Sequence, residues 1–455
     1  MNTVRRYRDA TLSYASGRPT WLTRTVFALG KKRESDLSLI RHRGGGHANN
    51  AQLSSTRGPR ALHIVDTLGM GGAETWLMEL LRLWHQQGPL APHIDILASS
   101  GNPGMFDSEA RALGAHIFYL RYCRRHLGAF CRGLRKILSQ TRYDVIHDHQ
   151  DYVSGWHFLM GINLLPAVRV THVHSPWIHI EADYAISPSR RISANLGKQL
   201  VSRLATHVCG TSREVLEVYS FLSGNAGGPM VSVVHCGIDI AKFNRSREQD
   251  RPSVLAEFGW PADTRLILFA GRLDRALELD HPQNEKNSWF ALTVARMALN
   301  KDPRVRLLMV GAGDEPRRRL RAQIRDWGLT DQLQLPGLRK DIPRLMRAAD
   351  VLFFPSRHEG LGMVAVEAQA ACLPVLASTT VPRECCVVPP LFNTLSLSEP
   401  ATVWADSLLR VMAHTRPSLE MCRIELSRSA FSITNSARML EQVYSRTIPC
   451  EESLL

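Results

Sequence analysis

A regular alternation of short apolar runs with longer amphipathic segments starts at residue 61 and leaves few folds open to this chain. Runs such as ALHIVD (61–66) and RLILFAGR (265–272) are rich in β-branched and apolar residues, which is typical of strands buried on both faces. Segments between them, such as AETWLMELLRLWHQQ, have helical periodicity. This order predicts the α/β class, with parallel sheets covered by helices on both faces.

The alternation runs in two series that flank a polar stretch. In the first series about seven strands are expected, at ALHIVD, HIDILA, AHIFYL, YDVIHDH, AVRVTHVH, ATHVCG and VSVVHCG. The second series predicts strands at RLILFAGR, RVRLLMVGAG, DQLQLPG, DVLFFPS and LPVLAS, with helices at about 288–300, 316–327, 341–349 and 363–371. The stretch IDIAKFNRSREQDRPSVLAEFGWPADT is polar, contains two prolines and is predicted to be the linker.

Four parts of the chain follow from this pattern. Residues 1–59 are expected to be a basic, disordered tail, and residues 60–243 and 244–430 to be two doubly wound domains. Residues 431–455 are expected to form a helix that packs back toward the first domain, followed by a tail. In such domains ligands bind beyond the carboxyl ends of the strands, so functional residues are expected just after strands.

The charge and the cysteines exclude several classes of function. The formal net charge is +14, but residues 1–60 hold 12 Lys/Arg against 3 Asp/Glu, so the rest of the chain is only mildly basic. No nucleic-acid-binding motif accompanies it, and nucleic acid is not an expected partner. The tail is interpreted as a flexible segment or an early start codon rather than a targeting signal, and it could lie against anionic lipid. The nine cysteines show no C-x-x-C spacing, which favours reduced thiols in a cytoplasmic protein.

The segment HEGLGMVAVEAQAACLPVLAS (358–378) places two glutamates around a glycine-rich loop. A helix is expected from residue 362 or 363, and its residues are apolar on nearly every side except Glu367. A buried carboxylate needs partners, and no Lys or Arg lies within a turn or two on this helix. Glu367 is therefore either on an exposed edge or paired with a distant Arg, or it faces a ligand together with Glu359. Sugar hydroxyls and a phosphate at the helix start would satisfy all these groups.

The spacing of Glu359 and Glu367, with seven residues between them and the second glutamate at the start of a helix, resembles the signature of glycosyltransferase family 4. The resemblance spans about residues 60–445 and is greatest to bacterial exopolysaccharide and capsule glycosyltransferases. It implies the GT-B fold, in which two Rossmann-like doubly wound parallel-sheet domains face a cleft. It also implies that Glu359 contacts hydroxyls of the donor sugar, that Glu367 holds the ribose, and that Gly360, Leu361 and Gly362 line the donor site.

The resemblance also assigns cations to the diphosphate of the donor. Arg272 follows a strand, and the family pairs it with a lysine a few residues later. The best match is Lys286, although it stands 14 residues away, with RALELDHPQ as an apparent insertion. Both could instead be ordinary surface cations.

Histidines follow two other strands. By alternation His172 and His174 share one strand face, and the resemblance implies that His174 corresponds to the family's active-site histidine. His172 is interpreted as a buried core residue or as one that supports the site without touching the substrate. His147 and His149 are candidates for the acceptor side, and ordinary burial is the alternative for both. The remaining donor-binding candidates are loop residues in LGMGGAET, in VGAGDE and after PG, namely Gly71, Gly72, Gly311, Gly313, Leu338 and Arg339.

With these features, the resemblance implies a retaining glycosyltransferase that moves a hexosyl unit from a nucleotide diphosphate sugar, with a UDP-sugar favoured. The expected acceptor is a glycan or lipid-linked molecule in exopolysaccharide, capsule or lipopolysaccharide synthesis, at the cytoplasmic face of the membrane or free in the cytoplasm. No D-x-D pair occurs, so we expect no metal and no cofactor besides the sugar nucleotide as substrate. The alternatives are a degenerate GT-B scaffold protein and another nucleotide-sugar enzyme, such as a 2-epimerase.

Overall fold

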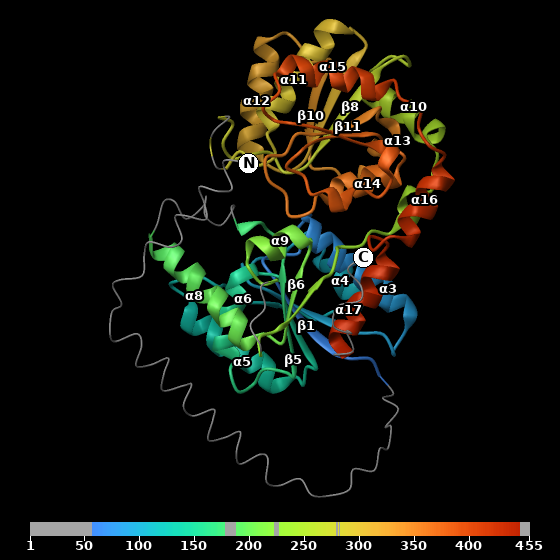
Figure 1. Ribbon diagram of the computed structural model, residues 1–455. Helices are drawn as coiled ribbons and strands as arrows, with labels where there is room; N and C mark the ends of the chain where they lie inside the picture. Colours follow the sequence, from blue (N-terminus) through green and yellow to red (C-terminus); the bar gives the residue numbers. More distant parts are fainter. Residues whose placement is uncertain (1–56, 178–187, 223–226, 279–280, 282, 446–455) are drawn as a thin grey trace, which may run out of the picture. The chain divides into compact units, whose positions relative to one another are not determined.

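Two parallel sheets, of seven and six strands, form the framework of the protein (Figure 1). The computed structural model describes residues 57–177, 188–222, 227–278, 281 and 283–445. The predicted basic tail (1–59) falls almost entirely outside these residues, and so does the tail that follows residue 445. None of the helices in the described part of the chain is long and apolar enough to cross a membrane.

The first sheet has the strand order β3-β2-β1-β4-β5-β6-β7. The order reverses between β1 and β4, and ligands bind doubly wound sheets at such a switch point. The strands are β1 (Arg60–Val65), β2 (His93–Ala98), β3 (Ile117–Tyr119), β4 (Val145–Asp148), β5 (Val168–Val173), β6 (His207–Gly210) and β7 (Met230–Val233). The helices are α3 (Gly72–Gln87), α4 (Asp107–Ala112), α5 (Leu127–Gln140), α6 (Ser154–Gly161), α8 (Pro188–Leu204) and α9 (Arg213–Val218), with short 3-10 turns η1 (Asp151–Val153) and η2 (Ile240–Phe243).

The second sheet repeats this topology, with the order β10-β9-β8-β11-β12-β13 and its switch point between β8 and β11. Its strands are β8 (Arg265–Ala270), β9 (Val305–Val310), β10 (Leu333–Gly337), β11 (Val351–Phe354), β12 (Val375–Ser378) and β13 (Phe392–Leu395). Its helices are α10 (Arg247–Glu257), α11 (Ser288–Lys301), α12 (Asp314–Asp326), α13 (Ile342–Ala348), α14 (Met363–Ala370), α15 (Ala401–Met412) and α16 (Leu419–Arg428), with 3-10 turns η3 (Arg383–Cys385) and η4 (Pro389–Leu391).

Each sheet separates two hydrophobic cores. In the first domain Trp76 of α3 belongs to the core on one face, and Phe130 of α5 to the core on the other. In the second domain Val366 of α14 and Trp404 of α15 lie in the two corresponding cores. Burial from both sides explains why the strands are nearly continuous apolar runs. The α/β class and the doubly wound parallel sheets predicted from the sequence are therefore confirmed.

The sequence prediction for the second domain did not include β13, α10, α15 or α16. The edge strand β13 was not expected, because its sequence FNTL has no apolar run and its residues are half-buried or exposed. The predicted linker contains the helix α10, whose start has a capping box between Ser246 and Gln249. Val254 and Leu255 of α10 are buried in the core of the second domain, so most of this polar stretch is part of that domain.

The C-terminal helix α17 (Ile433–Ser445) lies along α3 of the first domain (Figure 1). The indole Nε1 of Trp76 donates to Ser436 Oγ at 2.9 Å, and Nε1 of Trp84 donates to Glu441 Oε1 at 2.7 Å. Leu440 and Val443 are fully buried in the same core as Trp76. The last described helix therefore completes one face of the first sheet.

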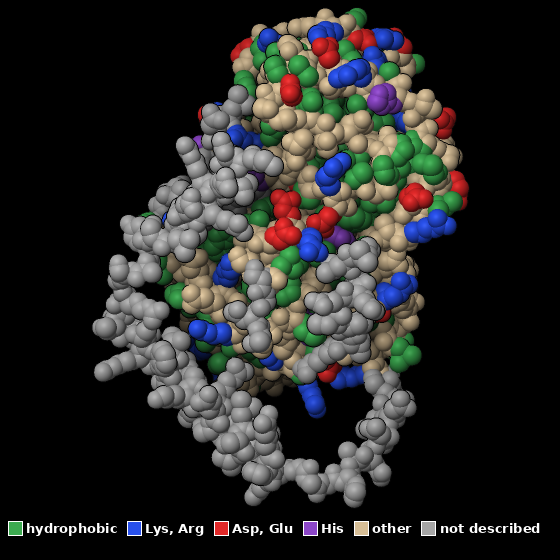
Figure 2. Space-filling model, in the orientation of Figure 1, with side chains coloured by type: hydrophobic (Ala, Val, Ile, Leu, Met, Phe, Trp, Pro, Cys, Tyr) green, Lys and Arg blue, Asp and Glu red, His purple; other side chains and the backbone are tan. Residues whose placement is uncertain are grey.

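Charged side chains are mixed on the face shown in Figure 2, where Lys and Arg alternate with Asp and Glu.

Candidate functional site

The loop between β11 and α14 carries the first glutamate of the signature. The hydroxyls of Ser378 and Thr380 both donate to the carbonyl oxygen of Ser356 and hold the start of the loop. At its end Gly362 has a left-handed conformation (φ 90°) as the residue before α14. A side chain there would be strained and would press on Phe354 and Val381.

Glu359 forms an ion pair with Lys286. Lys286 Nζ lies 2.5 Å from Glu359 Oε1, and the glutamate side chain is only 8% exposed. Asp274 explains how a lysine so far along the chain reaches the loop. Its carboxylate accepts hydrogen bonds from Lys286 N at 2.7 Å, and from Ser288 N at 2.8 Å and Ser288 Oγ at 2.7 Å. These hydrogen bonds hold the two ends of the segment between Asp274 and Lys286 together. Arg272 and Lys286 therefore lie near each other although 14 positions separate them in the sequence.

Arg272 reaches the same loop through Glu285. Arg272 Nη2 donates to Glu285 Oε2 at 2.8 Å, and the arginine side chain is 58% exposed. The carbonyl oxygen of Glu285 accepts from Arg357 N at 2.7 Å. The structure therefore brings Arg272, Lys286 and Glu359 together at the carboxyl ends of β8 and β11.

Gly360 is the point at which this loop touches the first domain. Ser212 Oγ donates to the Gly360 carbonyl oxygen at 2.5 Å. A Cβ atom on Gly360 would stand 2.0 Å from the carbonyl oxygen of His174, far below any real contact, so this close approach requires glycine. The backbone of His174 at the end of β5 thus lies against the loop that carries Glu359.

The backbone of His174 is fixed by Asp151. Asp151 Oδ1 accepts from His174 N at 2.8 Å and from Ser175 N at 3.5 Å. Asp151 has a left-handed backbone (φ 49°), which is uncommon outside glycine and found more often in aspartate. Burial raises the pKa of the Asp151 carboxyl to about 7, against the lowering effect of the hydrogen bonds from His174 and Ser175.

Five imidazoles form a layer on one face of the first sheet, at the carboxyl ends of three adjacent strands. We call it the imidazole layer; its members are His63, His147, His149, His172 and His174. The rings of His147 and His149 stack with centroids 4.3 Å apart, and so do those of His172 and His174. Side chains two positions apart share a strand face, so the predicted common face of His172 and His174 is confirmed. Trp76 of α3 packs edge-on against three of these rings.

Burial keeps the imidazole layer neutral. It lowers the pKa of His63 to about 3 and that of His174 to about 4, and it lowers the pKa values of His147, His149 and His172 far below the ordinary histidine value.

By distance alone, two triplets of this layer could serve as metal ligands. They are His63, His147 and His149, and His149, His172 and His174, whose nitrogens lie within 4.8 Å of one another. Metal ligands need lone pairs that converge on one point about 2 Å away. Here the rings are stacked, so their lone pairs lie in nearly parallel planes. Neighbouring ring nitrogens are hydrogen-bonded to one another. The layer is therefore better described as a hydrogen-bonded array.

His147 does not line an open site, so its predicted contact with the acceptor is wrong. Its side chain is fully buried, and both ring nitrogens are hydrogen-bonded, Nδ1 to the Tyr444 hydroxyl and Nε2 to His172. His149 is 7% exposed and contacts His174 directly, with 2.9 Å between His149 Nδ1 and His174 Nε2. Its position is behind His174 rather than on a free surface.

The two polar residues of α14 have different surroundings. The amide of Gln369 is fully used: it donates to Ala365 O and Cys385 O and accepts from the backbone N–H groups of Val387 and Val388. The carboxyl of Glu367, in contrast, has no hydrogen bond or ion pair to any residue that the structure describes. Burial raises its pKa to about 7; Glu79 adds to this shift, and Lys242 opposes it. Lys242 itself pairs with Glu79.

The predicted nucleotide loops lie beside the end of β8. Gly311 has φ 150°, and a Cβ on it would come within 1.7 Å of the Gly271 carbonyl oxygen. Leu273 N donates to Ala312 O at 2.8 Å, so this loop lies next to Arg272. Gly313 (φ 127°) is the residue before α12. Asp314 is the first residue of that helix.

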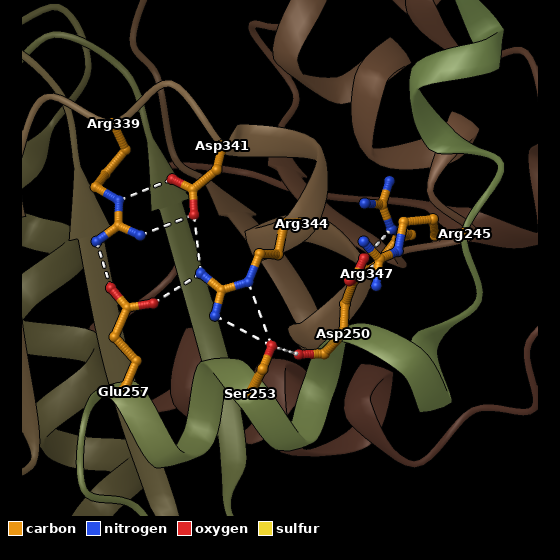
Figure 3. Close-up of polar contacts among 8 residues, drawn as sticks. All are labelled: Arg245, Asp250, Ser253, Glu257, Arg339, Asp341, Arg344 and Arg347. Carbon is orange, nitrogen blue, oxygen red and sulfur yellow. Dashed lines mark hydrogen bonds and ion pairs between the residues drawn. The ribbon is translucent and has the colours of Figure 1, made fainter.

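Arg339 is engaged in a network of ion pairs at the surface of the second domain (Figure 3). Its guanidinium pairs with Asp341 at 2.7 Å and with Glu257 at 2.6 Å, and Arg344 pairs with the same two carboxylates. These ion pairs link α10 to α13, so the guanidinium of Arg339 is already paired with two carboxylates. Leu338 is 42% exposed.

The glycines of the first loop precede α3. Gly71 is the residue before this helix, and a Cβ on it would stand 2.1 Å from the carboxylate of Glu74. Gly72 is exposed and begins the helix. Burial raises the pKa of Glu74, with a further rise from Asp66 at the end of β1.

Four residues around the site were not singled out from the sequence. Asp151 holds His174, Ser212 holds Gly360, Asp274 holds Lys286, and Glu285 links Arg272 to the signature loop. Asp151 and Asp274 each stand within a few residues of a strand end, and that position was an available signal. Ser212 acts on a residue 148 positions away, which no local pattern indicates.

Two family models match this chain. Residues 70–242 match the model described as "Glycosyltransferase Family 4", and residues 264–413 match the model described as "Glycosyl transferases group 1". The two matches include every strand of both sheets except β1.

Individual relatives agree with these matches. EpsF of Bacillus subtilis, whose assignment as a glycosyltransferase is provisional, is 29% identical over 390 residues, which cover 85% of this chain and 96% of EpsF. A D-inositol 3-phosphate glycosyltransferase of Corynebacterium urealyticum is 26% identical over 335 residues, covering 69% and 74% of the two chains. The crystal structure of Anabaena HepE in complex with UDP-glucose has a TM-score of 0.65 and 18% identity over 85% of this chain and all of HepE. This likeness confirms the predicted GT-B fold.

Proposed function

Because the chain belongs to the group 1, family 4 glycosyltransferases, we propose that it transfers a hexosyl unit, with retention of configuration, from a nucleotide diphosphate sugar. The observation that carries this proposal is the assembly of His174, Arg272, Lys286 and Glu359 around Gly360. These residues come from strand ends far apart in the sequence, and the fold brings them to one place. The nucleotide we propose is UDP, the nucleotide in the HepE complex.

Each group has a role that suits its chemistry. The Glu359 carboxylate accepts hydrogen bonds from hydroxyls of the sugar, and the ion pair with Lys286 orients it. Arg272, which is exposed and held only by one surface ion pair among the described residues, turns to the diphosphate when the donor binds. The two cations then stabilise the charge that grows on the leaving group.

In the step we propose, the bond between the anomeric carbon and the diphosphate oxygen breaks, and a bond from the acceptor oxygen to that carbon forms on the same face. The acceptor hydroxyl gives its proton to the departing phosphate oxygen, so the step does not call on a side-chain base. Glu367 supplies the ribose contact, because its carboxyl has no partner among the described residues and so is free to bind hydroxyls.

The acceptor we propose is a glycan or a lipid-linked sugar in the synthesis of a bacterial surface polysaccharide. The likeness to EpsF supports this class, as does the fold shared with WaaG, a glycosyltransferase involved in lipopolysaccharide biosynthesis. We propose that the reaction takes place in the cytoplasm, at the inner face of the membrane where the acceptor is lipid-linked.

Two variants test these assignments separately. Glu367→Ala is expected to weaken UDP binding about tenfold or more, whereas Glu359→Ala is expected mainly to lower turnover of a UDP-sugar, by about a hundredfold. UDP binding is measured by calorimetry, and turnover by UDP release. Full activity in both variants would show that the site is assigned wrongly. Release of a free 2-epimer in place of a glycoside, or UDP binding without turnover in wild type, would favour the alternatives.

A further inference from the structure

The imidazole layer and Tyr444 of α17 form one continuous chain of hydrogen bonds that ends at His174. From one end the contacts are His172 Nε2 to Val234 O (3.1 Å), His172 Nδ1 to His147 Nε2 (3.2 Å) and His147 Nδ1 to the Tyr444 hydroxyl (2.8 Å). They continue from the Tyr444 hydroxyl to His63 Nε2 (2.8 Å), from His63 Nδ1 to His149 Nε2 (2.9 Å), and from His149 Nδ1 to His174 Nε2 (2.9 Å).

One backbone carbonyl fixes the direction of the first half of this chain. The oxygen of Val234 can only accept, so His172 carries its proton on Nε2. A neutral imidazole has a single N–H, so His172 Nδ1 accepts from His147 Nε2. The same rule leaves His147 Nδ1 as an acceptor, and the Tyr444 hydroxyl must donate to it.

The second half follows from the hydroxyl of Tyr444. Its one proton is used, so its oxygen accepts from His63 Nε2. His63 Nδ1 then accepts from His149 Nε2, and His149 Nδ1 accepts from His174 Nε2. All five histidines of the imidazole layer are therefore Nε2–H tautomers. His174 Nδ1 remains without a proton, and its neighbour is the weak donor Cys236 Sγ at 4.0 Å.

We propose that Tyr444, His63, His147, His149 and His172 are positioning residues that hold His174 as the neutral Nε2–H tautomer with a fixed ring orientation. The end opposite His174 is the buried carbonyl oxygen of Val234, which cannot pass a proton on, so these hydrogen bonds orient His174 rather than conduct protons. The consequence for function rests on the glycosyl transfer proposed above: His174 can accept a hydrogen bond from a substrate hydroxyl at Nδ1, but its N–H is already used.

The C-terminal helix thus contributes to a site in the first domain. Tyr444 is the link that joins the two halves of the chain, and it lies 270 residues beyond His174. Loss of its hydroxyl separates His63, His149 and His174 from the carbonyl that sets their direction.

The test is a long-range proton–nitrogen spectrum of the full chain labelled with 15N in histidine, recorded without substrate. The His174 signals are identified by their loss in His174→Gln. We expect a single His174 tautomer with the proton on Nε2. A proton on Nδ1, or a mixture of tautomers in wild type, would overturn the proposal, and so would a spectrum that changes when EDTA is added, because the layer would then be holding a metal.

Tyr444→Phe provides the second test, with Trp84→Phe as its matched control. Tyr444→Phe removes the two hydrogen bonds of the Tyr444 hydroxyl, and Trp84→Phe removes the one from Trp84 Nε1 to Glu441, so both variants weaken the contact between α17 and the first domain. Trp84 takes no part in the hydrogen bonds that lead to His174. We expect tautomer averaging at His174 and about tenfold lower kcat in Tyr444→Phe, with KM for the donor changed less than about twofold. Trp84→Phe should retain the wild-type spectrum and kcat.

An unchanged single tautomer in Tyr444→Phe would refute the positioning role. Because the spectrum is recorded without substrate, the positioning role and the proposed function can each be refuted without the other. The predicted tautomer in a protein without transferase activity would contradict only the function, and active enzyme with mixed tautomers would contradict only the positioning role.

Discussion

The close approach of Gly360 to His174 makes a direct test of how the site is assembled. In Gly360→Ala the new Cβ would lie 2.0 Å from the His174 carbonyl oxygen, whereas real Cβ contacts essentially never fall below 3.0 Å. The signature loop and the end of β5 must therefore separate by about 1 Å. The obstacle is a backbone oxygen, so rotation of a side chain cannot relieve it.

A displacement of this size moves Glu359 relative to His174. A misplacement of about 1 Å can cost on the order of a hundredfold in rate, which corresponds to about 2.7 kcal/mol in the activation barrier. We expect kcat for UDP-sugar turnover to fall by about that factor. The melting temperature should change little, because the contact joins the two domains and a small shift between them relieves it.

Gly128→Ala serves as the control for this experiment. Gly128 lies in the first turn of α5, and a Cβ atom on it would have the flexible end of Arg132 as its nearest neighbour, at 3.6 Å. Its activity should equal that of wild type. Wild-type turnover in Gly360→Ala would refute the reasoning that this loop and His174 act as one site.

Three further variants probe the groups around this contact. Glu367→Gln should be more stable than wild type above pH 7, by on the order of 2 kcal/mol after allowance for partial exposure. The folded-state pKa of Glu367 is raised from 4.5 to about 7, so this gain should shrink as the pH falls from 7 and vanish below about 4.5, as measured by urea unfolding at several pH values; a constant difference would contradict the shift. Asp274→Ala removes three hydrogen bonds that close the segment before Lys286; it should cost about 3 kcal/mol of stability and lower turnover, and normal turnover would show that the segment does not position Lys286. Lys286→Met leaves Glu359 unpaired and should cost about 2 kcal/mol in urea unfolding, most of which Glu359→Gln in the same chain should restore; additive losses would argue against the ion pair.

The sequence predicted the framework because its signals are local. Runs rich in apolar residues mark β1 and β8, and the alternation of side chains along β5 places His172 and His174 on one face. Where the local signal is weak, the prediction was wrong. The strand β13 has no apolar run, and α10 is polar on its outer face although Val254 and Leu255 are buried.

The candidate site was predictable only in part, for the same reason. Glu359, Glu367 and the glycines between them form a contiguous motif, and the family models confirm the resemblance that this motif indicates. The contacts that complete the site join distant residues, such as Tyr444 with His147 and Ser212 with Gly360. The burial of His147 likewise depends on α17, which the residues near His147 do not reveal.

The central claim is that this protein uses a nucleotide diphosphate sugar, and a calorimetric titration of the purified full chain with UDP, GDP and ADP tests it most directly. Each titration is made with magnesium and with EDTA, in wild type and in Glu367→Ala. We predict that UDP binds wild type equally well in both conditions and binds Glu367→Ala at least about tenfold more weakly. Failure of all three nucleotides to bind wild type would contradict the claim.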